Sequence, residues 1–235
     1  MSTREVVLVE GVRTAFGRMG GTIRDYTCSQ LGGMGIKGLL DKTKIAEKAH
    51  VDSVFLGSAI GCSNSGTPAR WATLASGLGY ETSASYVEMQ CGSAIDSINH
   101  AAWKILANQA DIIIAGGMES YSQVAVKFSM ATTPFKLIPP MPIPSTLSPI
   151  AEECIGMGLT AENLQVQYNI PREAADEFAY NSQMRAKAAQ DGGYFKDEII
   201  PVTIPGTRKT PEFVFDVDEH PRAESTLEGM AKLNP

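Results

Sequence analysis

A cysteine stands where a strand-like run gives way to a helix. The run reads ASYVEMQ, and Cys91 follows it directly, ahead of Gly92 and the helical stretch SAIDSINHAAWKILAN. Unbonded N–H groups and the macrodipole at a helix N-terminus favour an anion, so a thiolate gains more there than a neutral thiol does. Cys91 is therefore a candidate nucleophile, and the backbone N–H groups of Cys91 and Gly92 are candidate oxyanion donors. A small buried hydrophobe is the alternative for a cysteine without a disulfide.

A nucleophilic cysteine normally needs a base, and the chain has three histidines, His50, His100 and His220. His100 follows Cys91 on one predicted helix, about 13.5 Å further along its axis, which is too far for proton transfer. His220 lies in a polar run that predicts a surface loop, and His50 lies in a helix-to-strand connection. We therefore expect the base for Cys91 to come from outside this chain.

Other residue patterns favour structural roles. Gly116 and Gly117 follow a predicted strand without a phosphate-loop motif, so they indicate a tight turn. The carboxylates Asp216, Asp218 and Glu219 are interpreted as a solvated loop rather than an acid/base pair. The four cysteines show neither C-x-x-C spacing nor clustering with histidine, so we expect no metal site and no disulfides.

Short apolar runs alternate with helical stretches in the first half of the chain. The predicted strands cover residues 6–9, 53–60, 85–89 and 111–115, and the predicted helices cover residues 28–49, 67–77 and 92–108. This alternation predicts βαβ units and a largely parallel sheet. Thr27 is expected to cap the first helix. The third helix has Asp96 and Lys104 as its only charges, so we expect it to be covered on more than one side, with Cys91 opening into the interior.

The second half begins with a proline-rich excursion over residues 132–149, where missing N–H groups exclude a regular helix or central strand. Helices are predicted over residues 160–168, 171–191 and 225–232, and strands over residues 198–204 and 212–216.

Composition limits the partners. The 235 residues are 43% hydrophobic and 20% charged, which is typical of a folded globular protein. A net charge of −6 lacks the positive excess that nucleic acid or an anionic membrane would require. We find no signal h-region and no membrane-length apolar run, so a reducing cytoplasm is the expected location.

Sequence blocks spread over nearly the whole chain resemble the thiolases, the family of acetyl-CoA acetyltransferases and 3-ketoacyl-CoA thiolases. In chain order they are VRTAFGRMGG, TPARWATLASGL, QCGSA, AGGMESYS, MGLTAEN, DEFAYNSQMRAKAAQDGGYFKDEIIPV and TLEGMAKLNP. The resemblance implies an α/β fold class: residues 1–119 form a thiolase-like N-terminal half, with a mixed, mostly parallel sheet and a buried central helix. It also implies that residues 120–235 form an inserted α+β loop domain that binds coenzyme A, and that the family's C-terminal half is absent from the sequence.

The resemblance also implies the chemistry. Cys91 would be acylated by a thioester and would pass the acyl group to coenzyme A or to an acetyl-CoA carbanion, with acyl-CoA as substrate and no tightly bound cofactor. Met157 of the loop domain would pack against the pantetheine, and Arg208 would face the nucleotide phosphates. Without the resemblance, Met157 would be interpreted as core and Arg208 as solvated surface.

The chain departs from the family in and around these motifs. A second cysteine in C-x-G-G-G-x-G, a histidine in G-H-P-x-G and an Asn-Glu or His-Glu motif do not occur. Gly156 replaces a histidine that contacts the coenzyme in the family. Glu88 replaces an asparagine, and Ala94 replaces a glycine, both close to Cys91.

Three hypotheses follow. The chain is a catalytic subunit of a two-chain thiolase, paired with a second polypeptide that carries the C-terminal half, in a dimer or tetramer of such pairs. Alternatively it is a non-catalytic acyl-CoA-binding or scaffold protein derived from a thiolase half, or a truncated piece of one long chain. The intact QCGSA block favours the first hypothesis over the second, because a scaffold needs no thiolate.

Overall fold

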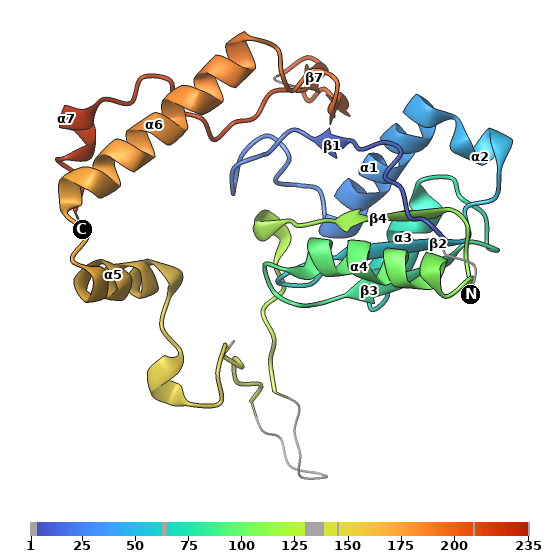
Figure 1. Ribbon diagram of the computed structural model, residues 1–235, viewed down its shortest axis with the longest axis horizontal. Coiled ribbons are helices and arrows are strands. Elements are labelled where there is room, and N and C mark those ends of the chain that lie inside the picture. Colours follow the sequence, from blue (N-terminus) through green and yellow to red (C-terminus); the bar gives the residue numbers. More distant parts are fainter. Residues whose placement is uncertain (1–3, 63–64, 130–138, 145, 209, 235) are drawn as a thin grey trace. The chain divides into compact units, whose positions relative to one another are not determined.

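The computed structural model describes residues 4–62, 65–129, 139–144, 146–208 and 210–234. The chain divides into two compact units, Met1–Ala125 with Phe195–His220, and Val126–Tyr194 with Pro221–Pro235 (Figure 1). This division places residues 195–220 with the first unit, unlike the predicted boundary after residue 119. The assignment of residues 120–235 to a loop domain that binds coenzyme stays a prediction. Residues 130–138 and 145 of the proline-rich segment lie outside the described residues.

A three-stranded parallel sheet forms the centre of the first unit. β2 (Ser53–Gly57) lies between β3 (Ser83–Val87) and β4 (Ile113–Gly117). All five residues of β2 are buried, as expected for a strand covered on both faces. The predicted parallel sheet and the α/β fold class are confirmed.

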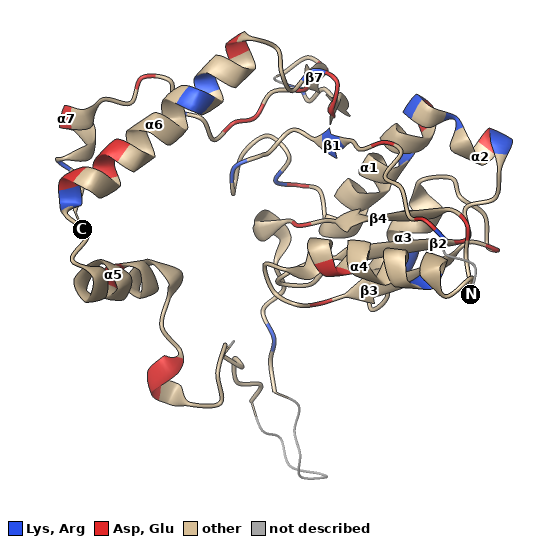
Figure 2. Ribbon diagram, in the orientation of Figure 1, with Lys and Arg blue, Asp and Glu red and all other residues tan. Residues whose placement is uncertain are grey.

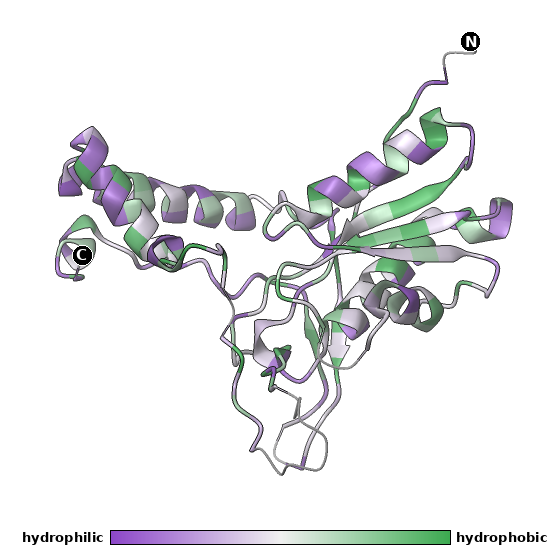
Figure 3. Cartoon of the chain, turned by 90° about the horizontal axis from the view of Figure 1, so that it is seen from below, coloured by the Kyte–Doolittle hydropathy of each residue, from purple (hydrophilic) through white to green (hydrophobic). Residues whose placement is uncertain are grey.

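Helices lie on both faces of this sheet. Because side chains alternate along a strand, Val54 and Leu56 join one core cluster with residues of α1 (Cys28–Thr43) and α3 (Pro68–Ala75). Phe55 joins a second, smaller cluster with Val87 and Ala101, a residue of α4 (Ser93–Leu106). Figures 1 and 3 show helices on both faces of this sheet. The sheet therefore has a thick core on one face and a thin one under α4.

The first helix begins and ends with recognisable signals. The Thr27 side chain accepts the Gln30 N–H and the Gln30 side chain accepts the Thr27 N–H, so the predicted cap is confirmed as a capping box. Lys44 has φ 54°, a left-handed conformation that interrupts the helix. The single helix predicted over residues 28–49 is therefore α1 followed by the short α2 (Ile45–Lys48).

The strand predicted over residues 6–9 is wrong for this structure. Val7, Leu8 and Val9 are 67%, 87% and 83% exposed, and the segment pairs with no strand among the described residues. Arg4 fixes its start, donating to the Ala110 carbonyl oxygen at 2.9 Å and pairing with the Asp111 carboxylate. β-branched residues favour a strand, but a strand forms only where a neighbouring strand supplies hydrogen bonds.

Short strands complete the first unit. β1 (Arg13–Thr14) pairs in parallel with β5 (Ile199–Ile200), and β6 (Val202–Ile204) pairs antiparallel with β7 (Phe213–Phe215). The strands predicted over residues 198–204 and 212–216 are confirmed, with the first divided at Pro201, whose ring nitrogen carries no hydrogen. A 3-10 turn, η1 (Tyr121–Gln123), follows β4.

Asp218 and Glu219, which were expected in a solvated loop, instead form hydrogen bonds with residues 13–22, which we call the N-terminal loop. The Asp218 carboxylate accepts hydrogen bonds from the two terminal guanidinium nitrogens of Arg13 at 2.7 and 3.0 Å. It also accepts a hydrogen bond from the Phe16 N–H at 2.8 Å. Glu219 accepts the N–H groups of Arg18 at 2.7 Å and Thr22 at 3.1 Å. The interpretation as a solvated loop is therefore wrong for Asp218 and Glu219.

The described part of the second unit is helical. It contains η2 (Ala151–Glu153), α5 (Met157–Tyr168), α6 (Arg172–Asp191) and α7 (Leu227–Met230). Arg172 at the start of α6 donates to the carbonyl oxygens of Met230 at 2.8 Å and Leu233 at 2.9 Å, which ties α7 to α6. The three predicted helices are confirmed. Among the described residues, no helix combines the length and apolarity that a membrane span requires.

We predict that Asp218 makes the first unit sensitive to acid. Burial raises the pKa of Asp218, but hydrogen bonds from Arg13 and the Phe16 N–H outweigh burial and hold the pKa below its ordinary value of 3.8. A lowered pKa stabilises the fold above the unfolded-state pKa, and this stabilisation is lost as the pH falls through the folded-state pKa. Asp218→Asn should lower the free energy of unfolding at pH 7 by about 1.5–3 kcal/mol.

Urea denaturation between pH 7 and pH 3 measures this effect. The difference between the parent protein and Asp218→Asn should shrink on acidification. Asp216→Asn is the control, because Asp216 is an exposed carboxylate two residues away. A constant difference across the pH range would contradict the prediction.

Candidate active site

Cys91 lies in the turn between β3 and α4. β3 ends at Val87, α4 begins at Ser93, and Gly92 is the N-cap without a side-chain hydrogen bond. The turn is strained, because Gln90 has φ 49° in the left-handed region. Cys91 is exposed, so the expectation that its thiol opens into the interior is wrong for this structure. The reason lies in α4, which the described residues cover on one side.

The two sides of α4 are reversed relative to an ordinary amphipathic helix. Its buried residues are small, namely Ser93, Ser97 and Ala101, which follow one another at intervals of four. Its large apolar side chains face outward: Ile95 is 64%, Ile98 36%, Trp103 59% and Leu106 54% exposed. Figure 2 shows charge on α4 at few positions. We expected α4 to be covered on more than one side, but the described residues cover it on one side. The other side is an exposed apolar surface.

The backbone around the thiol offers one unaccepted donor. The Gly92 N–H donates to the Met89 carbonyl oxygen at 3.0 Å, whereas none of the described residues accepts the Cys91 N–H. A Cβ at Gly92 would lie 2.6 Å from the Met89 methyl carbon, so the tip of that side chain occupies the space beside the glycine. The oxyanion roles of both N–H groups stay predictions, and the Cys91 N–H is the one available in this conformation.

The histidines do not serve Cys91 in the described structure. The His100 Nδ1 lies 2.9 Å from the Asp96 carbonyl oxygen on α4, and its ring packs edge-on against Trp103 at 5.4 Å between centroids. His50 and His220 are exposed. Among the described residues, no histidine is hydrogen-bonded to the thiol. The expectation that the base for Cys91 comes from outside this chain stays a prediction.

The other three cysteines differ from Cys91 in exposure. Cys28 is 2% exposed, and burial followed by the contact with Cys62 raises the pKa of its thiol far above the ordinary range. Cys62 Sγ lies 3.0 Å from Ser29 Oγ, and the Cys154 thiol donates to the Ser148 carbonyl oxygen at 3.1 Å. The four cysteines form no disulfide, and the described residues contain no cluster of His, Cys, Asp and Glu that would hold a metal.

The residues expected to bind coenzyme lie on different units. Met157 is the first residue of α5 in the second unit and is 66% exposed. Arg208 is exposed, in the connection between β6 and β7 in the first unit. Gly156 is the N-cap of α5 and provides no side chain to it. The coenzyme roles of Met157 and Arg208 stay predictions.

The two departures nearest the thiol have local explanations. Glu88 accepts the side-chain amide of Gln90 at 3.2 Å, so it contacts the strained residue of the turn. The Cβ of Ala94 lies 2.9 Å from where a Cβ at Gly117 would be, so the alanine fits because position 117 is glycine.

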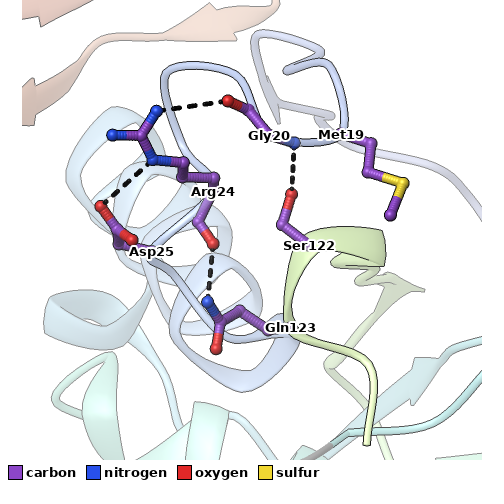
Figure 4. Close-up of a pocket in the computed structure, with 6 residues that line it drawn as sticks. All are labelled: Met19, Gly20, Arg24, Asp25, Ser122 and Gln123. Atoms are coloured by element: carbon purple, nitrogen blue, oxygen red, sulfur yellow. Dashed lines mark hydrogen bonds and ion pairs between the residues drawn. The ribbon is translucent and has the colours of Figure 1, made fainter.

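One pocket of the first unit has a lining that does not include Cys91. It is a depression of about 570 Å³, lined by Met19, Gly20, Arg24, Asp25, Ser122 and Gln123 (Figure 4). The Gly20 N–H donates to Ser122 Oγ at 2.9 Å, and Gln123 donates to the Arg24 carbonyl oxygen at 2.8 Å. None of the predicted site residues lines it.

Ser93 is a residue of the site that the sequence did not single out. Its hydroxyl accepts the Met89 N–H at 2.9 Å, and it lies 2.6 Å from the Gln90 carbonyl oxygen. The only signal in the sequence is its place two residues after Cys91 in QCGSA.

Comparison with known proteins identifies the family. The family model described as the thiolase N-terminal domain matches residues 6–235. The chain belongs to the thiolase family. This thiolase chain is 37% identical over 234 residues to an acetyl-CoA acetyltransferase of Chromobacterium violaceum, and 39% identical over 239 residues to a β-ketoadipyl-CoA thiolase of Acinetobacter baylyi.

A solved structure gives the same result for the fold. The crystal structure of the Bacillus anthracis acetyl-CoA acetyltransferase matches 95% of this thiolase chain with a TM-score of 0.82 at 34% identity. The match covers 57% of that protein. The matches to the two relatives named above cover 98% of this chain but 59% of each relative. The sequence therefore spans about three-fifths of the length of the thiolases it matches, and it corresponds to their N-terminal part.

We predict that Cys91 is the thiol that alkylates first. Iodoacetamide should modify Cys91 ahead of the half-buried Cys62 and Cys154, and Cys28 last, because Cys28 is buried and its raised pKa keeps it protonated. Peptide mass spectrometry over a time course measures the order, in the protein as purified with any polypeptide that accompanies it. Earlier labelling of Cys28, Cys62 or Cys154 with Cys91 unmodified would remove Cys91 as the nucleophile.

Proposed function

We propose that this chain supplies the nucleophile for acyl transfer between acyl-CoA thioesters, as in acetyl-CoA C-acetyltransferases and 3-ketoacyl-CoA thiolases. The observation that carries the proposal is the exposed Cys91 two residues before α4, whose own N–H no described residue accepts. The Cys91 thiolate attacks the thioester carbonyl carbon, an S–C bond forms, and the coenzyme A thiolate leaves. The acyl group then passes to another coenzyme A or to an acetyl-CoA carbanion.

The developing oxyanion needs a donor, and we propose the Cys91 N–H for this role. Attack on the carbonyl carbon moves negative charge to its oxygen, where a fixed backbone N–H stabilises the transition state. The thiol proton also needs an acceptor, and none of the described histidines is hydrogen-bonded to Cys91. We therefore assign proton transfer to a cysteine and a histidine in the part of the thiolase that this sequence does not contain.

The substrate is acyl-CoA, and no tightly bound cofactor takes part in the proposed reaction. Arg208 is proposed to contact the nucleotide phosphates, for which a guanidinium offers paired donors. Met157 is proposed to pack against the pantetheine, and its 66% exposure leaves the side chain accessible.

We propose further that the missing C-terminal part covers the outward side of α4. Ile95, Trp103 and Leu106 are more than half exposed there, and Val7–Val9 add a second exposed apolar segment. Soluble monomers rarely expose contiguous apolar patches beyond a few hundred Å², so this surface favours an interface of more than about 2,000 Å². About two-fifths of the relatives' length lies beyond the part that this chain matches. We propose that this length provides the cover.

We propose that the covering part is a second polypeptide and that such pairs assemble into dimers or tetramers. The alternative is the continuation of one longer chain, of which the 235 residues are a piece. Intact mass of the native protein, with mass spectrometry of every chain that co-purifies, decides between them. A partner-free, acyl-CoA-binding protein that never turns over would instead favour a scaffold.

Arg208→Ala should weaken coenzyme A binding roughly 10- to 150-fold, because one charge-assisted contact contributes about 1.5–3 kcal/mol. Isothermal titration with coenzyme A measures the dissociation constant in the complete assembly. Arg185→Ala, which removes an exposed arginine of α6, is the matched control. An unchanged dissociation constant in Arg208→Ala would exclude the contact.

The 235-residue chain alone should not turn over. We expect it to be poorly soluble or self-associated because the α4 surface is uncovered, and any acylation of Cys91 should stop after one equivalent. A thiolysis assay with and without the C-terminal part, together with the mass of acylated Cys91, measures both effects. Cys91→Ala in the complete assembly should abolish turnover and retain coenzyme binding. Full turnover by the chain alone, with no other polypeptide detectable, would refute the requirement.

A further inference from the structure

One buried hydroxyl makes side-chain hydrogen bonds to the turn that carries Cys91. Ser93 is 2% exposed, and its Oγ accepts the Met89 N–H at 2.9 Å. The same hydroxyl can donate its one hydrogen to the Gln90 carbonyl oxygen at 2.6 Å or to the Ser58 carbonyl oxygen at 3.2 Å. It therefore contacts the backbone on both sides of Gln90 and also reaches the segment that follows β2.

These contacts act on the strained residue of the turn. Gln90 has φ 49°, a conformation that non-glycine residues adopt only where their surroundings impose it. Its carbonyl oxygen also accepts the Ser93 N–H at 3.1 Å. Because Cys91 is the next residue, the orientation of Gln90 sets where the thiol and the Cys91 N–H point.

Ser93 is itself fixed by its surroundings. A Cβ at Gly57 would lie 2.5 Å from the Ser93 carbonyl carbon and oxygen, so α4 lies directly on the end of β2. The adjoining Ser58 is held by Glu119, whose carboxylate accepts Ser58 Oγ at 2.8 Å and the Ala59 N–H at 2.6 Å. Tyr86 adds a hydrogen bond from its hydroxyl to the Ser58 carbonyl oxygen at 3.2 Å.

We infer that Ser93 is a positioning residue for the nucleophile: its hydroxyl, supported by Ser58 and Glu119, keeps the Met89–Gly92 turn in the conformation that presents the Cys91 thiol and N–H. Loss of the hydroxyl leaves the Met89 N–H without its acceptor and lets Gln90 leave the left-handed region. The inference rests on the proposed function, because both concern the same thiol.

The test is the alkylation rate of Cys91 in Ser93→Ala, measured with iodoacetamide from pH 6 to pH 10 in the protein as purified with any partner. We expect the rate at neutral pH to fall about tenfold, as for the loss of one or two buried hydrogen bonds, and the pH profile to shift. Ser97→Ala is the matched control. It removes an equally buried hydroxyl one turn along α4, which donates to the Ser93 carbonyl oxygen at 3.0 Å and does not reach the turn.

Ser97→Ala should alkylate within twofold of the parent protein. Equal rates in the parent, Ser93→Ala and Ser97→Ala would overturn the inference, as would equal losses in the two variants. The buried Cys28 reports folding in the same experiment, because it labels only if the unit opens. If Ser93→Ala labels Cys28, Glu119→Gln decides instead: a slower Cys91 rate with Cys28 protected supports the inference, and an unchanged rate overturns it.

The outcome is separable from that of the proposed function. If acetyl-CoA acylates Cys91 of the parent protein while Ser93→Ala alkylates normally, the positioning role fails and the function stands. If Cys91 is not acylated in the complete assembly, the function fails. A slower Ser93→Ala rate would then still establish that the hydroxyl orients the thiol.

Discussion

The close approach of α4 to the end of β2 is the contact on which the candidate site depends. Only a glycine fits at position 57, because a Cβ would lie 2.5 Å from the Ser93 backbone. A second close contact, Gly117 against Ala94, fixes the same turn of the helix over β4. Together they place the start of α4 at the carboxyl ends of parallel strands, where α/β proteins commonly bind ligands. The thiol, the strained Gln90 and the Cys91 N–H take their positions from this contact.

The same contact explains why α4 buries small residues and exposes its large apolar ones. A helix that approaches a sheet so closely can bury only small residues, and serine hydroxyls remain satisfied there by backbone carbonyls. The large apolar residues are therefore on the outward side, where each would gain about 1.5–3 kcal/mol from full burial. The thin core under α4, with Phe55, Val87 and Ala101 as its buried members, gives the same indication. Both features are those of a helix that the described residues cover on one side.

Distant segments close the first unit around its N-terminal loop. Arg13 binds Glu198 at 2.7 Å and Asp218 at 2.7 Å, and its guanidinium lies 4.8 Å from the centre of the Phe16 ring. Asp218 and Glu219 also accept hydrogen bonds from the N–H groups of Phe16 and Arg18, in the loop that follows β1. Ion pairs and hydrogen bonds to backbone N–H groups thus keep residues 195–220 with the first unit, although the chain reaches them only after α5 and α6 of the second unit.

The sequence by itself determined the parallel α/β sheet, the capping of α1 by Thr27 and the place of Cys91 before α4, because periodicity, caps and turns are local. It also carried the family, through motifs such as QCGSA and MGLTAEN. It did not determine that residues 6–9 lack a neighbouring strand among the described residues, that Asp218 binds Arg13, or that the Ser93 hydroxyl accepts the Met89 N–H. Those outcomes depend on which segments meet in space. Only the tertiary structure decides whether a strand has a hydrogen-bonded neighbour, whether a carboxylate pairs with an arginine, and which backbone groups a buried hydroxyl contacts.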